Sequence, residues 1–212
     1  MLAYRSDANL NLWDGPPGDR LATQMAQGRF LVLQERCEQA YRVQLCEDRY
    51  EAFLAAADLA HLVPDTYAPL PLLTVAEIQG RLGGAIAYGL AALAVPNAYV
   101  WGGTLPPNFD CSGLVQAAFA AVGIWLPRDA YQQEAFTVPV AAPEPGDLVF
   151  FGIERATHVG LWLGDGQYLH SSGPERGHNG IAIDLWAGGT PVANRYRAEW
   201  RGFGRVTRSG VG

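Results

Sequence analysis

The sequence predicts an α+β fold in two parts, a small all-β barrel followed by a domain that starts with helices and ends with strands. Three observations predict it: short β-like segments before residue 64, an amphipathic helix-length segment after residue 74, and a second apolar helix that starts at a cysteine. At 212 residues and 49% hydrophobic content, the chain is long enough for one or two packed domains.

The first part contains short β-like segments separated by turn residues, a pattern typical of a small barrel. The segments are Leu10–Trp13, Leu21–Met25, Phe30–Leu33 and Tyr41–Leu45. The proline-rich stretch Pro64–Pro71 cannot continue a helix or a central strand. We therefore expect a first domain over residues 1–66, a linker over 67–73 and a second domain over 74–212.

The second domain is expected to open with a helix over residues 74–95. Apolar residues recur there at near-helical spacing, and Thr74 with Glu77 three residues later forms a capping-box pattern. Pro96 marks the end of the helix.

Cys111 stands at the first turn of the next apolar helix. Free backbone N–H groups at a helix N-terminus favour thiolate over thiol, and Asp110 occupies the N-cap position. These features suit a nucleophile, although a small apolar helix can also contain a buried, inert cysteine.

His158 and His170 follow on two short apolar runs separated by Gly164-Asp165-Gly166, which predict a β-hairpin. A three-residue loop, or a compensating bulge, places both histidines on one face as diagonal neighbours. His158 is then the candidate general base for Cys111, and His170 the group that accepts from its other ring nitrogen. The alternative for His170 is a strand-end histidine in a polar loop mouth.

Composition excludes several classes of partner. The formal net charge of −6, without basic runs, argues against nucleic acid and anionic membranes. No stretch has the continuous apolar length of a membrane span. No Cys or His pair has zinc-ligand spacing, so neither a metal nor another cofactor is expected. The three cysteines fit a reducing compartment, although pairing of Cys37 with Cys46 remains open.

Five motifs in order resemble the NlpC-type papain-like cysteine peptidases. They are Tyr99–Thr104, Asp110–Gln116, Arg128–Gln133, Pro145–Phe151 and His158–Gly160, within a similarity over residues 74–207. The resemblance implies a papain-like domain with Cys111, His158 and His170 as catalytic residues. It also makes the Tyr99 hydroxyl a donor near the oxyanion, together with the Cys111 backbone N–H. The alternative for Tyr99 is an ordinary core aromatic.

The first domain resembles a bacterial SH3-like domain, and the pair of domains looks most like γ-D-glutamyl-L-diamino acid endopeptidases of cyanobacterial type. Such enzymes cut between D-Glu and diaminopimelate in murein peptides with a free N-terminal L-Ala. Acidic groups would hold that ammonium in a closed subsite. The expected substrate-binding residues are Asp110, Ser112, Arg128, Asp129, Trp101, Tyr50, Glu47 and Asp48.

Some of these roles stay open. Glu47 and Asp48 fit a solvated turn equally well, and Arg128 pairs with Asp129 or meets a substrate carboxylate. With no secretory signal visible at the start, we expect a cytoplasmic monomer that recycles murein peptides. The alternatives are an exported wall hydrolase whose SH3-like domain binds the wall, and a non-catalytic binding protein on the same scaffold.

Overall fold

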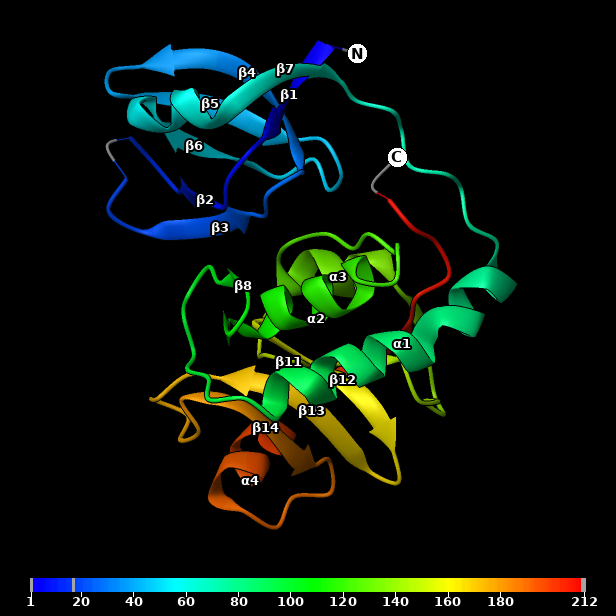
Figure 1. Ribbon diagram of the computed structural model, residues 1–212. Helices are drawn as coiled ribbons and strands as arrows, with labels where there is room; N and C mark the ends of the chain where they lie inside the picture. The colour runs from blue at the N-terminus through cyan, green and yellow to red at the C-terminus, as the bar shows by residue number, and fades with distance from the viewer. Residues whose placement is uncertain (1, 17, 211–212) are drawn as a thin grey trace.

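The computed structural model describes residues 2–16 and 18–210 and consists of an N-terminal β-domain and a larger α+β domain (Figure 1). The N-terminal domain contains one seven-stranded sheet of order β3-β2-β6-β5-β4-β1-β7. Its strands are β1 (Leu2–Ser6), β2 (Leu10–Trp13), β3 (Leu21–Met25), β4 (Phe30–Cys37), β5 (Ala40–Leu45), β6 (Glu51–Ala55) and β7 (Leu62–Thr66). A short 3₁₀ helix, η1 (Ala56–His61), precedes β7.

The four strands expected in this domain are present, and the third extends to Cys37. Strands β1, β6 and β7 were not predicted from the sequence. Leu12, Leu31 and Leu54 are fully buried in the core of this domain. The prediction of a small all-β domain is therefore confirmed.

Helix α1 (Val75–Leu93) confirms the helix expected after the linker. Thr74 Oγ1 accepts from the Glu77 backbone N–H at 3.3 Å, and a Glu77 carboxylate oxygen accepts from the Thr74 N–H at 2.8 Å. This reciprocal capping box satisfies two N–H groups that would otherwise lack partners. Figure 1 shows the chain running from β7 down one side of the molecule to α1.

The second domain is built on a six-stranded antiparallel sheet of order β10-β15-β11-β12-β13-β14. The strands are β10 (Val138–Val140), β11 (Leu148–Phe151), β12 (His158–Gly164), β13 (Gln167–Ser172), β14 (Gly180–Leu185) and β15 (Trp200–Arg205). The helices are α1, α2 (Cys111–Ala120), α3 (Ala130–Phe136) and α4 (Pro191–Ala198), with a two-stranded ribbon β8 (Thr104–Leu105) and β9 (Asn108–Phe109) before α2.

The sheet lies between two apolar layers because its central strands are apolar on both faces. Leu148 and Phe150 of β11 pack in the same core as α1 and α2. Val149 and Phe151 pack in a second core with Tyr196 of α4. The mixed α/β architecture expected for this domain is confirmed.

The hairpin of β12 and β13 differs in detail from a simple three-residue loop. Gly164 pairs with Gln167, so the loop has two residues, and a bulge lies between Trp162 and Gly164. Asp165 and Gly166 both have positive φ, 50° and 76°, as a type I′ turn requires. The bulge keeps both histidines on one face despite the two-residue loop. A compensating bulge was one of the two arrangements expected from the sequence.

Polar contacts fix the β-domain against the α+β domain. Gln24 of β3 accepts through Oε1 from the backbone N–H groups of Thr104 and Leu105 at 3.0 and 3.2 Å. The Gln116 amide donates to Asp48 at 2.9 Å, and the Arg29 guanidinium stacks over Trp125. None of the helices in the described residues is long and apolar enough to cross a membrane.

Candidate active site

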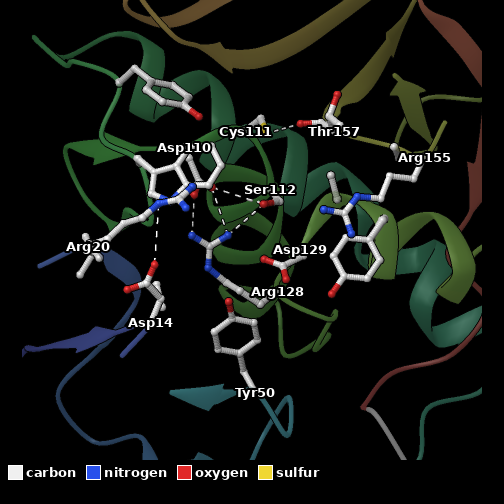
Figure 2. Close-up of a pocket in the computed structure, with 17 residues that line it drawn as sticks. Asp14, Arg20, Tyr50, Asp110, Cys111, Ser112, Arg128, Asp129, Arg155 and Thr157 are labelled. Carbon is white, nitrogen blue, oxygen red and sulfur yellow. Dashed lines mark hydrogen bonds and ion pairs between the residues drawn. The ribbon is translucent and has the colours of Figure 1, made fainter. Parts of the chain in front are cut away.

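Cys111 opens α2 and lines a cleft to which both domains contribute residues (Figure 2). Asp110 is the N-cap, and its Oδ1 accepts from the Gly113 N–H at 2.7 Å, as the sequence predicts. Cys111 is 6% exposed, and its Sγ lies 3.9 Å from the carbonyl oxygen of Thr157, the residue before His158. The start of α2 is thereby held against the start of β12.

The carboxylate of Asp110 is fully occupied within the protein. The Arg128 guanidinium donates two hydrogen bonds to it, at 3.1 and 2.6 Å, and the Gly102 N–H donates to the same carboxylate at 2.9 Å. Arg128 is itself 1% exposed and also donates to Ser112 Oγ and, across the domain boundary, to Thr23 Oγ1. Arg128 thus pairs with Asp110, a partner that was not among the expected ones. Asp110 also lines the cleft, and its contact with a substrate ammonium stays a prediction.

His158 and His170 are hydrogen-bonded neighbours, as the hairpin register predicts. His158 Nε2 lies 2.8 Å from His170 Nδ1. His170 Nε2 lies 3.1 Å from Asp184 Oδ2, and His178 Nε2 lies 2.9 Å from the same oxygen. A chain of three histidines and one carboxylate thus extends from the buried His158 to the partly exposed His178.

Sequence reasoning missed Asp184 and His178. Asp184 lies on β14 directly opposite Tyr168, so its position depends on the pairing of a third strand. The only signal in the sequence was a polar residue interrupting the apolar run Ile181–Leu185.

Burial sets the protonation of Cys111 and His158. It raises the pKa of the Cys111 thiol to about 12, with Asp110 adding to the effect and backbone N–H groups opposing it. Burial also lowers the pKa of His158 well below its ordinary value, and His170 adds to that shift. The resting pair is therefore a neutral thiol and a neutral imidazole, which differs from the thiolate that the helix N-terminus alone would favour.

Tyr196 of α4 forms one wall beside His158, and sequence reasoning also missed it. The two rings stack with centroids 4.1 Å apart and planes inclined by 23°. The Tyr196 hydroxyl shares a 2.8 Å hydrogen bond with Ser172 Oγ. A stacked, tethered aromatic ring limits rotation of the imidazole.

The cleft has a volume of about 270 Å³. Of the expected residues it is lined by Tyr99, Trp101, Cys111, Ser112, Arg128, Asp129, Tyr50 and Asp110. The sequence did not point to Asp14, Arg20, Tyr131 and Arg155, which also line it. Figure 2 shows Tyr50 approaching from the β-domain below Asp129 and Arg128.

Asp129 is the carboxylate most suited to a cationic ligand. It is the N-cap residue of α3, and burial raises its pKa despite the nearby Arg128 cation. Burial raises the pKa of the Tyr50 hydroxyl, and the negative charge of Asp129 raises it further, so the two side chains interact electrostatically. A cation that binds here would offset the free-energy cost of burying the ionised Asp129 carboxylate.

Glu47 and Asp48 do not line this cleft, so their expected place in it is wrong. Arg29 pairs with both carboxylates, at 3.2 and 3.0 Å. Glu47 also accepts from the Phe30 N–H, and Asp48 from Gln116 of α2. These two acids neutralise a buried arginine at the domain boundary, a long-range arrangement that local sequence does not reveal.

Trp101 and Tyr99 approach Cys111 from the loop before β8. Trp101 is 56% exposed, and Arg20 of the β-domain stacks over it at 4.4 Å. Burial raises the pKa of the Tyr99 hydroxyl, and the nearby Cys111 adds to the shift. Tyr99 therefore stays protonated and able to donate.

His170, His178 and Asp184 place three metal-ligating atoms within 4.8 Å of one another. The two hydrogen bonds to Asp184 already join these atoms, so we assign them to the histidine chain. Cys37, Cys46 and Cys111 are all free thiols.

Comparison with known proteins identifies the family. Residues 96–191 match the NlpC/P60 family, and residues 12–59 match the bacterial dipeptidyl-peptidase SH3 domain. The chain is 33% identical to peptidoglycan endopeptidase RipB of Mycobacterium tuberculosis over 92% of this chain and 88% of RipB. The chain belongs to the NlpC/P60 family.

Other NlpC/P60 relatives are longer. The probable endopeptidase p60 of Listeria seeligeri is 40% identical over 62% of this chain, which spans 21% of p60. An NlpC/P60 protein from Bacillus cereus shares the fold, with a TM-score of 0.52 at 22% identity over 97% of this chain and 63% of that one.

Proposed function

We propose that this NlpC/P60 protein is a cysteine endopeptidase that cuts the γ-D-Glu–diaminopimelate bond of murein peptides with a free N-terminal L-Ala. One observation carries the proposal. Cys111 lines a cleft that residues of the β-domain also line, and its Sγ lies 3.9 Å from the carbonyl oxygen of Thr157, the residue before the hydrogen-bonded His158–His170 pair, so the site suits the end of a peptide. RipB, which is named a peptidoglycan endopeptidase, supports the reaction class.

The chemistry follows from the pairing of ring nitrogens. His170 occupies His158 Nε2, which leaves Nδ1 to take the proton from the Cys111 thiol as sulfur attacks the γ-carbonyl carbon. The C–N bond to diaminopimelate then breaks, and the protonated His158 gives its proton to the leaving amine. A water that His158 deprotonates hydrolyses the thioester and regenerates the thiol.

The oxyanion of each tetrahedral intermediate needs two donors. The backbone N–H of Cys111 has no partner within its own helix because it is the first residue of α2. The Tyr99 hydroxyl lines the same cleft and stays protonated. These two groups are the proposed oxyanion donors.

The ammonium of L-Ala is assigned to Asp129, with Tyr50 and Ser112 beside it. Asp129 carries the carboxylate in the cleft that burial destabilises, so a substrate cation restores its favourable charge balance. The match of the β-domain to the bacterial dipeptidyl-peptidase SH3 family supports a subsite that holds two residues before the cut. L-Ala-γ-D-Glu is such a pair.

A hydrolase of intact wall peptides is the second candidate, because RipB is named for peptidoglycan. It differs from the first in substrate, since wall peptides carry no free L-Ala amine. A cytoplasmic recycling role belongs to the first candidate and is tested by cell fractionation. The complete Cys111–His158–His170 set argues against a non-catalytic binding protein.

Product analysis tests the proposal. The purified protein is incubated with L-Ala-γ-D-Glu-diaminopimelate and separately with murein sacculi, and products are identified by mass spectrometry. We expect L-Ala-γ-D-Glu and free diaminopimelate from the tripeptide, and no products from the Cys111→Ala protein. Release of peptides from sacculi with no cleavage of the tripeptide would establish the second candidate.

A further inference from the structure

Asp184 is a buried carboxylate that the proposed mechanism does not use. It is 5% exposed on β14, and one oxygen, Oδ2, receives both His170 Nε2 and His178 Nε2. His178, in the loop between β13 and β14, has a side chain that is 27% exposed. Asp184 is therefore hydrogen-bonded directly to His170 and is linked to His158 through His170.

The protons of this chain can be placed from the acceptors. Burial favours a neutral Asp184, but hydrogen bonds from His170 and His178 outweigh it and lower the pKa of the carboxyl. An ionised carboxylate only accepts, so each Nε2 that faces it must carry a proton.

The proton positions on His170 and His158 follow from the same rule. Burial lowers the pKa of His170, although Asp184 opposes the shift, so His170 is neutral and its single proton is on Nε2. Its Nδ1 can then only accept, and His158 Nε2 must donate to it. His158 is also neutral, which leaves its lone pair on Nδ1.

We propose that Asp184 is a positioning residue that fixes the tautomers of His170 and His158, so that His158 keeps Nδ1 free as the base for Cys111. His178 holds the Asp184 carboxylate in place by donating to the same oxygen. The inference rests on the proposed role of Cys111 as nucleophile. Without Asp184, His170 is free to carry its proton on Nδ1, and His158 Nε2 then faces a donor and must become an acceptor.

The test compares Asp184→Ala, Asp184→Asn and His178→Ala with Tyr168→Phe. Tyr168 lies opposite Asp184 in the sheet, and its buried hydroxyl has no hydrogen-bond partner among the described residues, so it is a matched control. Asp184→Asn keeps the size of the side chain and guards against loss of folding in the alanine variant. Thermal unfolding confirms that each protein is folded.

Three measurements are made on the full chain. They are kcat and KM on the tripeptide, the ¹⁵N NMR spectrum of histidine-labelled protein, and the rate at which iodoacetamide alkylates Cys111, followed by mass spectrometry. For Asp184→Ala we expect kcat to fall about 10- to 100-fold with KM little changed. The fall in kcat should be smaller for Asp184→Asn, because its amide oxygen can still accept a hydrogen bond from His170, and smaller again for His178→Ala. The kcat of Tyr168→Phe should match that of the wild type.

The spectrum should show the Nε2–H tautomer of His170 in the wild type and a mixture in Asp184→Ala. Alkylation of Cys111 should slow in the same order as kcat. An Nδ1–H tautomer of His170 in the wild type, or folded Asp184 variants with wild-type kcat and alkylation, would overturn the inference. Alkylation that depends on Asp184 in a protein that cleaves no peptide would support it while contradicting the proposed function.

Discussion

At the scale of single residues, the account depends on Cys111 and His158 acting as one unit. Cys111→Ala should abolish hydrolysis, because no other group in the cleft can form the thioester. The residual rate of His158→Ala should lie within about tenfold of the residual rate of Cys111→Ala. The double variant should be no slower than Cys111→Ala, because the effects of residues that act as a unit are not additive. Initial rates on the tripeptide, with thermal unfolding as a control for folding, check this.

His170→Asn should be milder, since an amide oxygen can still accept from His158 Nε2. Turnover by pure Cys111→Ala protein would refute the mechanism. A His170→Asn variant as inactive as Cys111→Ala would show that orientation is too small a role for His170.

The pH profile is a second residue-scale prediction. His158 must be neutral to accept the thiol proton, and burial holds its pKa well below 6.5. The base therefore stays neutral as the pH falls from 8 to 6.5, and kcat/KM should decline only at more acidic pH. The measurement is kcat/KM between pH 4.5 and 8.5, and an acid-side pKa at or above 6.5 would contradict the expected environment of His158.

At the scale of elements, the pairing of Asp110 with Arg128 fixes the start of α2. Arg128→Met removes the partner of a buried carboxylate and should lower the free energy of unfolding by about 3–5 kcal/mol. Arg155→Met, which changes an exposed arginine in the same cleft, should have an effect of about 0.5 kcal/mol or less. Urea unfolding of both proteins measures the difference, and equal midpoints would show that the pair does not stabilise this helix.

The sequence was informative where the determinants of an element are local. Thr74 with Glu77, Asp110 before Cys111, and the Gly164–Gly166 turn each act within a few residues, so helix starts and the hairpin could be predicted. Glu47 and Asp48 were misplaced because their partner, Arg29, lies 18 and 19 residues away in the sequence and is brought to them by the pairing of β4 with β5. Asp184 was missed because only the pairing of β13 with β14 brings it to His170.

At the scale of the whole molecule, the cleft depends on close approach of the two domains. Gly102 has φ +77°, and a Cβ there would lie 2.5 Å from the carbonyl oxygen of Leu21 in the β-domain. Gly102→Ala should therefore push the β-domain away from the cleft and lower kcat/KM on the tripeptide by about 10- to 100-fold. Steady-state kinetics on the tripeptide check this.

Gly83→Ala is the matched control, because Gly83 lies in α1 and a Cβ there meets nothing within 4 Å. It should leave kcat/KM unchanged and stabilise the helix by about 0.5–1 kcal/mol. Wild-type kinetics in Gly102→Ala would mean that the β-domain does not shape the subsite.

The most direct test of the central claim, that the cleft holds a free peptide amine, compares kcat/KM for L-Ala-γ-D-Glu-diaminopimelate and its N-acetylated form. In the proposed binding mode, acetylation removes the charge that would pair with Asp129 and adds bulk in a cleft that residues of both domains line. A lost charge-assisted hydrogen bond costs roughly 2–5 kcal/mol, so kcat/KM should fall about 30-fold to several thousand-fold. Asp129→Asn should narrow the gap by slowing cleavage of the free peptide, whereas equal rates on both peptides in the wild-type protein would contradict the account.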